Sequence, residues 1–237
     1  MADPSVSIWK PVTGAFVALL PITAVAAPVC AVPARVIPAP ETAPPPGEIV
    51  RDAPTTHYVL AMTWSPEWCR THADNPDSRF ECHDNRFGLI LHGLWPSNAD
   101  GRHPRYCGPA PALSPGLVRR MLCTTPSAKL LQHEWAAHGT CGWDSAARYF
   151  GQATTLWQRL RRPEFREDMT AGAIRDRFVA LNPALPRKGV HIRVASGNRL
   201  DEIFICYDLK FRPRGCPMGP GTPDGVRIRV EPVAPKG

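Results

Sequence analysis

The eight cysteines of this 237-residue chain constrain its fold more than any other sequence feature. No two of them form a Cys-x-x-Cys pair, so zinc ribbons and thioredoxin-type redox sites are disfavoured. In an oxidising compartment the default is a disulfide framework, which we expect to hold three bridges among the seven cysteines that follow residue 55. One thiol would then be left over or would pair with the most N-terminal cysteine. The cysteines are Cys30, Cys69, Cys82, Cys107, Cys123, Cys141, Cys206 and Cys216.

The N-terminus indicates such a compartment. Residues 11–27 form a short apolar run behind Lys10 and reach the small-residue pattern Ala-Val-Ala near their end. This is typical of a secretory signal peptide, which we place at residues 1–26. Glycine and proline interrupt the run, whereas a membrane span needs about 20 unbroken apolar residues. We therefore predict a secreted or periplasmic protein without a membrane anchor.

Proline and charge divide the rest of the chain. Eight prolines fall within residues 28–54, so residues 27–55 are interpreted as an extended linker. We expect a catalytic domain at residues 56–214 and a Pro- and Gly-rich tail at residues 215–237. The net charge is +7, and 23 of the 28 basic residues are arginines. A biased genome composition would explain this excess equally well, so it permits an anionic partner without proving one.

Hydrophobic periodicity predicts an α+β domain. We expect strands at residues 57–65, 87–95, 190–194 and 200–211, with a short one at residues 226–230. We expect helices at residues 114–121, 128–138, 146–160 and 173–181.

Two segments could carry chemistry. Residues 87–97 (FGLILHGLWPS) place His92 at the end of an apolar strand, and residues 133–141 (HEWAAHGTC) hold His133, Glu134 and His138. The unperturbed pKa of histidine, about 6.5, lets one copy take a proton while another gives one. Attack of an RNA 2′-OH on the adjacent phosphate needs such a pair and no metal, with further donors for the phosphoryl charge. The alternative is three structural histidines.

The alternative to general acid–base chemistry is a metal site. His133 and His138 are five residues apart, whereas the His-Glu-x-x-His zinc motif has a spacing of four. Five steps of about 100° leave the two rings roughly 140° apart on a regular helix, which argues against a metalloprotease. A distortion at the helix end could still bring them together. We expect no metal and no cofactor.

The two segments resemble the active-site segments of the ribonuclease T2 family, the second of which usually reads His-Glu-Trp-x-Lys-His-Gly-Thr-Cys. Residues 58–66, followed by Cys69, are similar to the family's opening strand, so the resemblance covers about residues 56–214. It implies a disulfide-stapled α+β fold with a central antiparallel sheet flanked by helices. It also implies an acid-type endoribonuclease that leaves 2′,3′-cyclic phosphate ends on single-stranded RNA with little base preference.

The resemblance also implies a role for each site residue. His138 would take the 2′-OH proton, His92 would protonate the leaving oxygen, and His133 would bind the phosphate. Glu134 would help to stabilise the pentacoordinate phosphorane. Trp95 would stack on a base, with core packing as its alternative role.

Two positions depart from the family pattern. Ala137 stands where the family usually places a lysine, so activity is expected to be lower unless an arginine from elsewhere substitutes. Ser97 occupies a position that is often acidic in adenine-preferring members, which leaves the base choice open.

The disulfide pairing follows from the motifs and the resemblance together. A bridge between the two active-site segments would clamp them, and a short loop near the C-terminus closes at small entropic cost. For the third bridge, Cys69, Cys82 and Cys123 compete, and Cys69–Cys82 is the preferred pair. The expected pairs are Cys107–Cys141, Cys206–Cys216 and Cys69–Cys82.

Two functions of different classes remain. The first is an active, monomeric ribonuclease with RNA as substrate. The second is a catalytically weak or inactive secreted RNA-binding or effector protein of the same fold. The intact set of three histidines and Glu134 favours the enzyme.

Overall fold

The computed structural model describes residues 1, 30–41 and 43–233, so the predicted signal peptide lies almost wholly outside the described residues. Within those residues, no helix has the length and apolar character that a membrane span requires. The strands are β1 His57–Trp64, β2 Leu89–Ser97, β3 Met169–Thr170, β4 Val190–Ala195, β5 Arg199–Tyr207 and β6 Arg227–Ile228. The α-helices are α1 Ser65–His72, α2 Pro115–Met121, α3 Ala128–Ala137, α4 Ala146–Arg159 and α5 Ala171–Leu181. Short 3₁₀ or π turns are η1 Pro76–Ser78, η2 Phe80–Asp84, η3 Gly139–Cys141 and η4 Arg187–Gly189.

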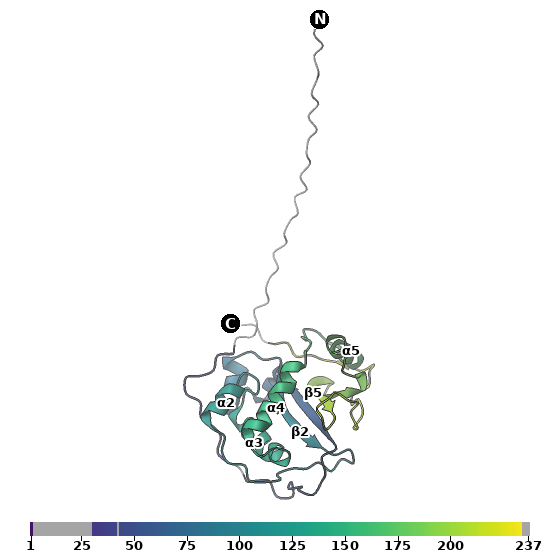
Figure 1. Cartoon of the computed structure of the whole chain (residues 1–237). Coiled ribbons are helices and arrows are strands. Elements are labelled where there is room, and N and C mark those ends of the chain that lie inside the picture. Colours follow the sequence, from purple (N-terminus) through teal and green to yellow (C-terminus); the bar gives the residue numbers. More distant parts are fainter. Residues whose placement is uncertain (2–29, 42, 234–237) are drawn as a thin grey trace.

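A four-stranded antiparallel sheet in the order β2-β1-β5-β4 forms the centre of the molecule (Figure 1). Successive side chains of a strand point to opposite faces of the sheet. Leu60 and Met62 of β1 therefore share one face with their register partners on β5, Ile205 and Ile203. The opposite face carries Thr63 and a second, smaller apolar cluster. The predicted α+β fold with a central antiparallel sheet is confirmed.

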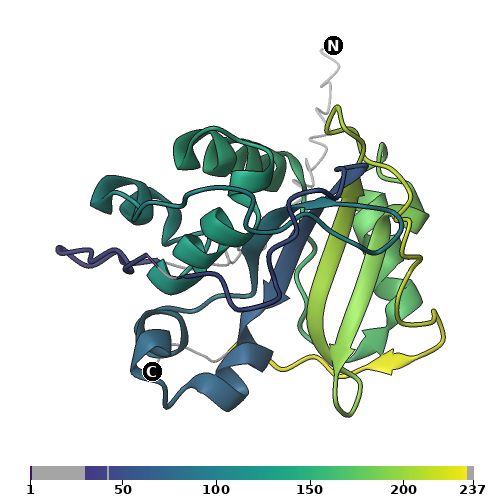
Figure 2. The same cartoon turned by 90° about the horizontal axis from the view of Figure 1, so that it is seen from below.

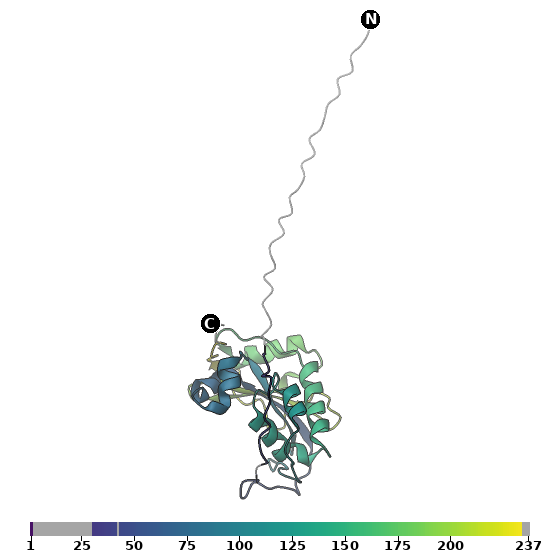
Figure 3. The same cartoon turned by 90° about the vertical axis from the view of Figure 1, so that its left-hand side faces the viewer.

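The helices begin at the capping residues that the sequence supplies. The side chains of Ser114, Ser127 and Thr170 each accept a hydrogen bond from a backbone N–H in the first turn of α2, α3 and α5. Apolar residues of α2 to α5 pack into one core with the sheet. Figure 2 shows α2, α3 and α4 gathered beside the β2 end of the sheet and α5 behind β4 and β5. In Figure 3 the blue segment containing α1 lies on the other side of the molecule from the green helices.

The predicted elements are present, with shifted ends. Strand β5 stops at Tyr207 rather than at residue 211, because the Asp208 carboxylate accepts the backbone N–H groups of Lys210 and Arg212 and closes a turn. Helix α1 was not predicted. It begins with Ser65-Pro66, and proline is favoured in a first helical turn.

The described part of the stretch expected to be a linker has no helix or strand, but it contacts the domain. Cys30 is joined to Cys123, which resolves the partner of the leftover thiol. The guanidinium of Arg119 donates to the carbonyl groups of Pro33 and Ala34. Further along, residues 50 and 105 exchange both backbone hydrogen bonds, at 2.9 and 2.8 Å. This N-terminal segment, residues 30–41 and 43–53, therefore packs against the domain.

All eight cysteines form disulfides. The three expected pairs are present, and the fourth bridge makes use of the cysteine in the N-terminal segment. The bridges are Cys30–Cys123, Cys69–Cys82, Cys107–Cys141 and Cys206–Cys216.

Candidate active site

A β-bulge in β2 places His92. Ala61 of β1 pairs with Gly93 and the next residue, Met62, pairs with Leu91, so His92 is the extra residue between them. In a regular strand, His92 and Trp95 would point to opposite faces, being three residues apart. The bulge brings both side chains to the same face, as bulges beside active sites commonly do. Their rings lie 5.3 Å apart, centroid to centroid.

Two residues on neighbouring strands hold the His92 ring. Its Nδ1 lies 2.7 Å from Oε1 of Glu202 on β5 and 3.0 Å from Oγ1 of Thr63 on β1. Thr63 also donates its hydroxyl hydrogen to Glu202, at 3.2 Å. Because Nδ1 is engaged by Glu202, Nε2 is the ring nitrogen left to face the site. Nε2 lies 3.3 Å from Oε1 of Glu134.

The end of α3 brings the other predicted residues together. Helix α3 stops at Ala137, and His138 adopts φ −123° and ψ −44°, outside the regular helix. The separation of 140° expected on a regular helix therefore does not apply to His133 and His138. One ligand atom from each of His133, Glu134 and His138 lies within 4.8 Å of the others, so this set could hold a metal ion. Of the two arrangements that the sequence left open, the structure has the one in which a distortion at the helix end brings the two imidazoles together.

Glu134 is the centre of the cluster. Its side chain is 1% exposed, and Oε2 accepts a hydrogen bond of 2.8 Å from the indole N–H of Trp95. Gly93 makes room for this carboxylate, since a β-carbon at position 93 would overlap Oε2 and lie 2.7 Å from Cδ of Glu134. The glycine directly after His92 is therefore required by the close approach of α3 to β2.

The same carboxylate leaves the two candidate proton-transfer histidines in opposite protonation states. Burial works against charge on His92, but Glu134 and Glu202 outweigh it and raise the pKa of His92 to about 10. Burial lowers the pKa of His138 to about 4, although Glu134 opposes this, and the charge of Arg105 lowers it further. The charges of His138 and His92 overcome burial and lower the pKa of Glu134 to about 2. At neutral pH, His92 is thus a cation and His138 a neutral base.

The Trp95 ring forms a wall of the site. It lies against His138 with centroids 5.3 Å apart and planes at 29°, and it also contacts Phe204 of β5. With its N–H bound to Glu134, the indole holds this carboxylate as well as lining the site. Ser97 is buried and donates its hydroxyl to the carbonyl of Trp95.

Sequence reasoning missed Glu202 and Thr63. Glu202 lies in the apolar run LDEIFICY and is 2% exposed, which is rare for a carboxylate unless it has a partner. That acidic residue within a central strand was the available signal. Its partner could not be read from the sequence, because the register that pairs Thr63 with Glu202 joins residues 139 positions apart.

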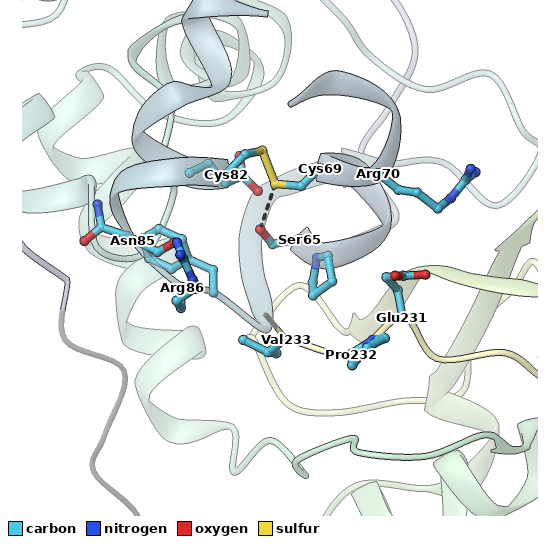
Figure 4. A pocket seen from close by; sticks show the side chains of 12 residues that line it. Ser65, Cys69, Arg70, Cys82, Asn85, Arg86, Glu231, Pro232 and Val233 are labelled. Carbon is cyan, nitrogen blue, oxygen red and sulfur yellow. Dashed lines mark hydrogen bonds between the residues drawn. A yellow bond between two sulfur atoms is a disulfide. The ribbon is translucent and has the colours of Figure 1, made fainter. Parts of the chain in front are cut away.

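A separate cavity of about 230 Å³ lies beside α1 and the Cys69–Cys82 bridge (Figure 4). Ser65, Arg70 and the C-terminal residues 231–233 line it, and the described lining residues include none of the three site histidines. It also contains Glu81, whose pKa burial raises to about 7.

Comparisons with known proteins agree with this fold. Residues 55–170 of the sequence match the sequence model of the ribonuclease T2 family. A probable ribonuclease of Haemophilus influenzae is 39% identical over 178 residues, which cover 69% of this chain and 62% of the relative. A ribonuclease of Aeromonas hydrophila is 35% identical over 133 residues, 56% of each chain. The chain spans about six tenths of the length of these curated relatives.

Solved structures share the architecture. A ribonuclease-related protein from Calystegia sepium has a TM-score of 0.60 at 19% identity, covering 76% of this chain and 98% of that one. RNase NT in complex with 5′-AMP has a TM-score of 0.54 at 21% identity, with 75% and 98% covered. At these identities the likeness shows the fold, a disulfide-bonded α+β domain. Together with the sequence matches, it supports the similarity of this chain to the ribonuclease T2 family.

Proposed function

We propose that this chain is an endoribonuclease that cleaves single-stranded RNA by attack of the 2′-OH on the adjacent phosphate. The products would carry a 2′,3′-cyclic phosphate on one side of the break and a 5′-OH on the other. The observation that carries the proposal is the pair of histidines in opposite protonation states around one buried carboxylate. A neutral base and a charged acid are what this reaction requires.

In the proposed reaction His138 takes the proton of the 2′-OH as that oxygen bonds to phosphorus. His92 gives its proton to the departing 5′-oxygen, and His133 binds the phosphate. Since Glu134 is itself an anion, its charge cannot stabilise an anionic phosphorane directly. We infer that it acts through the histidines, by keeping His92 protonated and holding Trp95. Trp95 would present its remaining surface to a base, with little base preference.

The proposal includes the biological setting. The four disulfides fit an oxidising compartment, so we propose a secreted or periplasmic monomer whose partner is its RNA substrate. No cofactor enters the proposed reaction.

The test is incubation of the purified protein with RNA in the presence and absence of EDTA. We expect cleavage in both conditions, cyclic phosphate ends, and no cleavage of a matched deoxyribo-oligonucleotide, which lacks the nucleophile. Activity lost in EDTA and restored by zinc would instead assign a metal to His133, Glu134 and His138. RNA binding without cleavage would favour the effector alternative.

A further inference from the structure

Ala137 stands where a lysine cation was expected near the phosphate. In the structure this position leaves no room for a long side chain. Ala137 is 0% exposed and packs in a small cluster with Tyr106 and Ala136. The backbone N–H of Tyr106 donates to the carbonyl of Ala137, at 3.0 Å. A longer side chain at position 137 would have to displace Tyr106. The segment containing Tyr106 therefore occupies the place beside α3 where a lysine would extend.

Arg105 is the residue directly before Tyr106 in this segment. Its guanidinium carbon lies 5.4 Å from the centroid of the Tyr106 ring, and this ring lies 6.3 Å from that of His133. Tyr106 adopts φ 53°, a backbone conformation that residues other than glycine rarely adopt. Such strain gathers at functional sites, where the surrounding structure maintains it.

Arg105 is held and partly desolvated. Its Nε is buried and, among the described residues, has no hydrogen-bond partner. Its Nη2 lies 2.9 Å from Oε2 of Glu48, and its backbone pairs with Val50. Both partners belong to the N-terminal segment, which lies outside the region matched to the family. A buried donor without a partner is costly, so a ligand oxygen that accepts from Nε would relieve that cost.

We propose that Arg105 supplies the cation that Ala137 lacks, donating to a phosphoryl oxygen of the substrate next to His133 and His138. This inference rests on the proposed ribonuclease function and adds a residue to it. The guanidinium suits phosphate oxygens because its donors form a planar fork. Its charge also acts on His138, the proposed general base, because it lowers the pKa of His138 further after the larger effect of burial.

The test compares Arg105→Gln and Arg105→Lys with a matched control, Arg102→Gln. Arg102 belongs to the same loop and pairs with Asp52 of the N-terminal segment at 2.6 Å, but both side chains are largely exposed. On a dinucleoside monophosphate substrate, we expect Arg105→Gln to lower kcat by about 10²-fold or more, with a smaller change in KM. Arg105→Lys should keep about a tenth of the activity or more, and Arg102→Gln should be unchanged.

The pH profile separates this role from a structural one. Without the cation the pKa of His138 rises, so the acidic limb of kcat/KM should move to higher pH in Arg105→Gln and stay in place in Arg105→Lys. If Arg105→Gln does not fold, Arg105→Met repeats the test, because its apolar stem can still cover the Tyr106 ring. If the wild type is active and Arg105→Gln or Arg105→Met keeps kcat within about twofold of it, this inference is overturned while the proposed function stands. A wild type without ribonuclease activity overturns the proposed function, and this inference with it.

Discussion

His92 and His138 face the same carboxylate, yet only His92 is held in its charged form. The difference comes from Glu202, which lies 2.7 Å from Nδ1 of His92 and gives that ring a second anion. No second carboxylate is among the main groups that shift the pKa of His138. Burial lowers that pKa most, and the charges of Arg105, His133 and His92 lower it further. One shared anion therefore produces two states because the neighbours differ.

Glu202→Gln should move the alkaline limb of the kcat/KM profile to lower pH. The amide removes one of the two anions that raise the pKa of His92 to about 10, so the acid loses its proton earlier as the pH rises. A nearby charge typically moves a pKa by about 1–3 units, and we expect a displacement in this range. Asp201→Asn is the control, since Asp201 precedes Glu202 on β5 and pairs with Arg193, which also pairs with Glu202, but is not among the groups that raise the pKa of His92. An unmoved limb in Glu202→Gln would show that Glu202 does not tune the acid.

Gly93→Ala should abolish the proposed ribonuclease activity with a moderate loss of stability. The added methyl group would overlap Oε2 of Glu134, so either the carboxylate or β2 must shift. A displacement of about 1 Å in a catalytic group can cost about 10²-fold in rate. Gly151→Ala is the control, because Gly151 lies in α4 with open space around its β-position and should gain about 0.5–1 kcal/mol. Steady-state kinetics and thermal unfolding would decide, and normal kcat in Gly93→Ala would refute the close-approach argument.

At the scale of the elements, the sequence predicts what depends on local periodicity. Strand β2 and helix α3, which ends one residue before His138, both follow from apolar spacing and capping residues, and the motifs identify their chemistry. The expectation that His92 stands at the end of its strand is wrong, because β2 continues to Ser97. The bulge at His92 and the irregular end of α3 do not follow, because both depend on contacts distant in sequence. The backbone of Leu91, for example, is bonded to residues 124 and 125 rather than only to its neighbouring strand. Glu202 and Arg105 join the site for the same reason.

The bridge Cys107–Cys141 joins the segment carrying Arg105 to the end of α3, beside His138. Removing it by double alanine substitution should cost about 3–4 kcal/mol of stability for its 34-residue separation. The rate should also fall, since the contacts nearest the lost bridge would be two single hydrogen bonds, one at Thr140 and one from the N–H of Tyr106. The Cys69–Cys82 bridge, with a separation of 13, is the control and should cost stability with little change in kcat below its unfolding temperature. Equal kinetic effects of the two double variants would contradict the clamp.

For the whole molecule, the N-terminal segment extends the domain beyond the part that its motifs define. Its apolar residues Val32 and Val36 pack against the main core, and the backbone N–H of Ala112 donates to the carboxylate of Glu41. The C-terminal residues do the same from the other end, since β6 pairs with β3 and the indole of Trp64 donates to the carbonyl of Glu231. Both ends of the described chain thus support the sheet that carries the site.

The bridge Cys30–Cys123 should decide whether the N-terminal segment stays in place. It closes a separation of 93 residues, so its loss should cost about 4–5 kcal/mol in the chain-entropy estimate. The contacts that would remain near it are the bond from the backbone N–H of Ala31 to Asn85, the bonds from Arg119 to two backbone carbonyls, and the packing of two half-buried valines. Such peripheral contacts open more easily than a core does. In a variant with both cysteines replaced by serine, trypsin should cleave after Arg35 much faster than in the wild type, under conditions where both are folded. The double serine variant of Cys69 and Cys82 should leave the bond after Arg35 protected. If trypsin cleaves after Arg35 equally fast in the wild type, the segment is not held by this bridge and its contact with Arg105 must be maintained by Glu48 and Val50 alone.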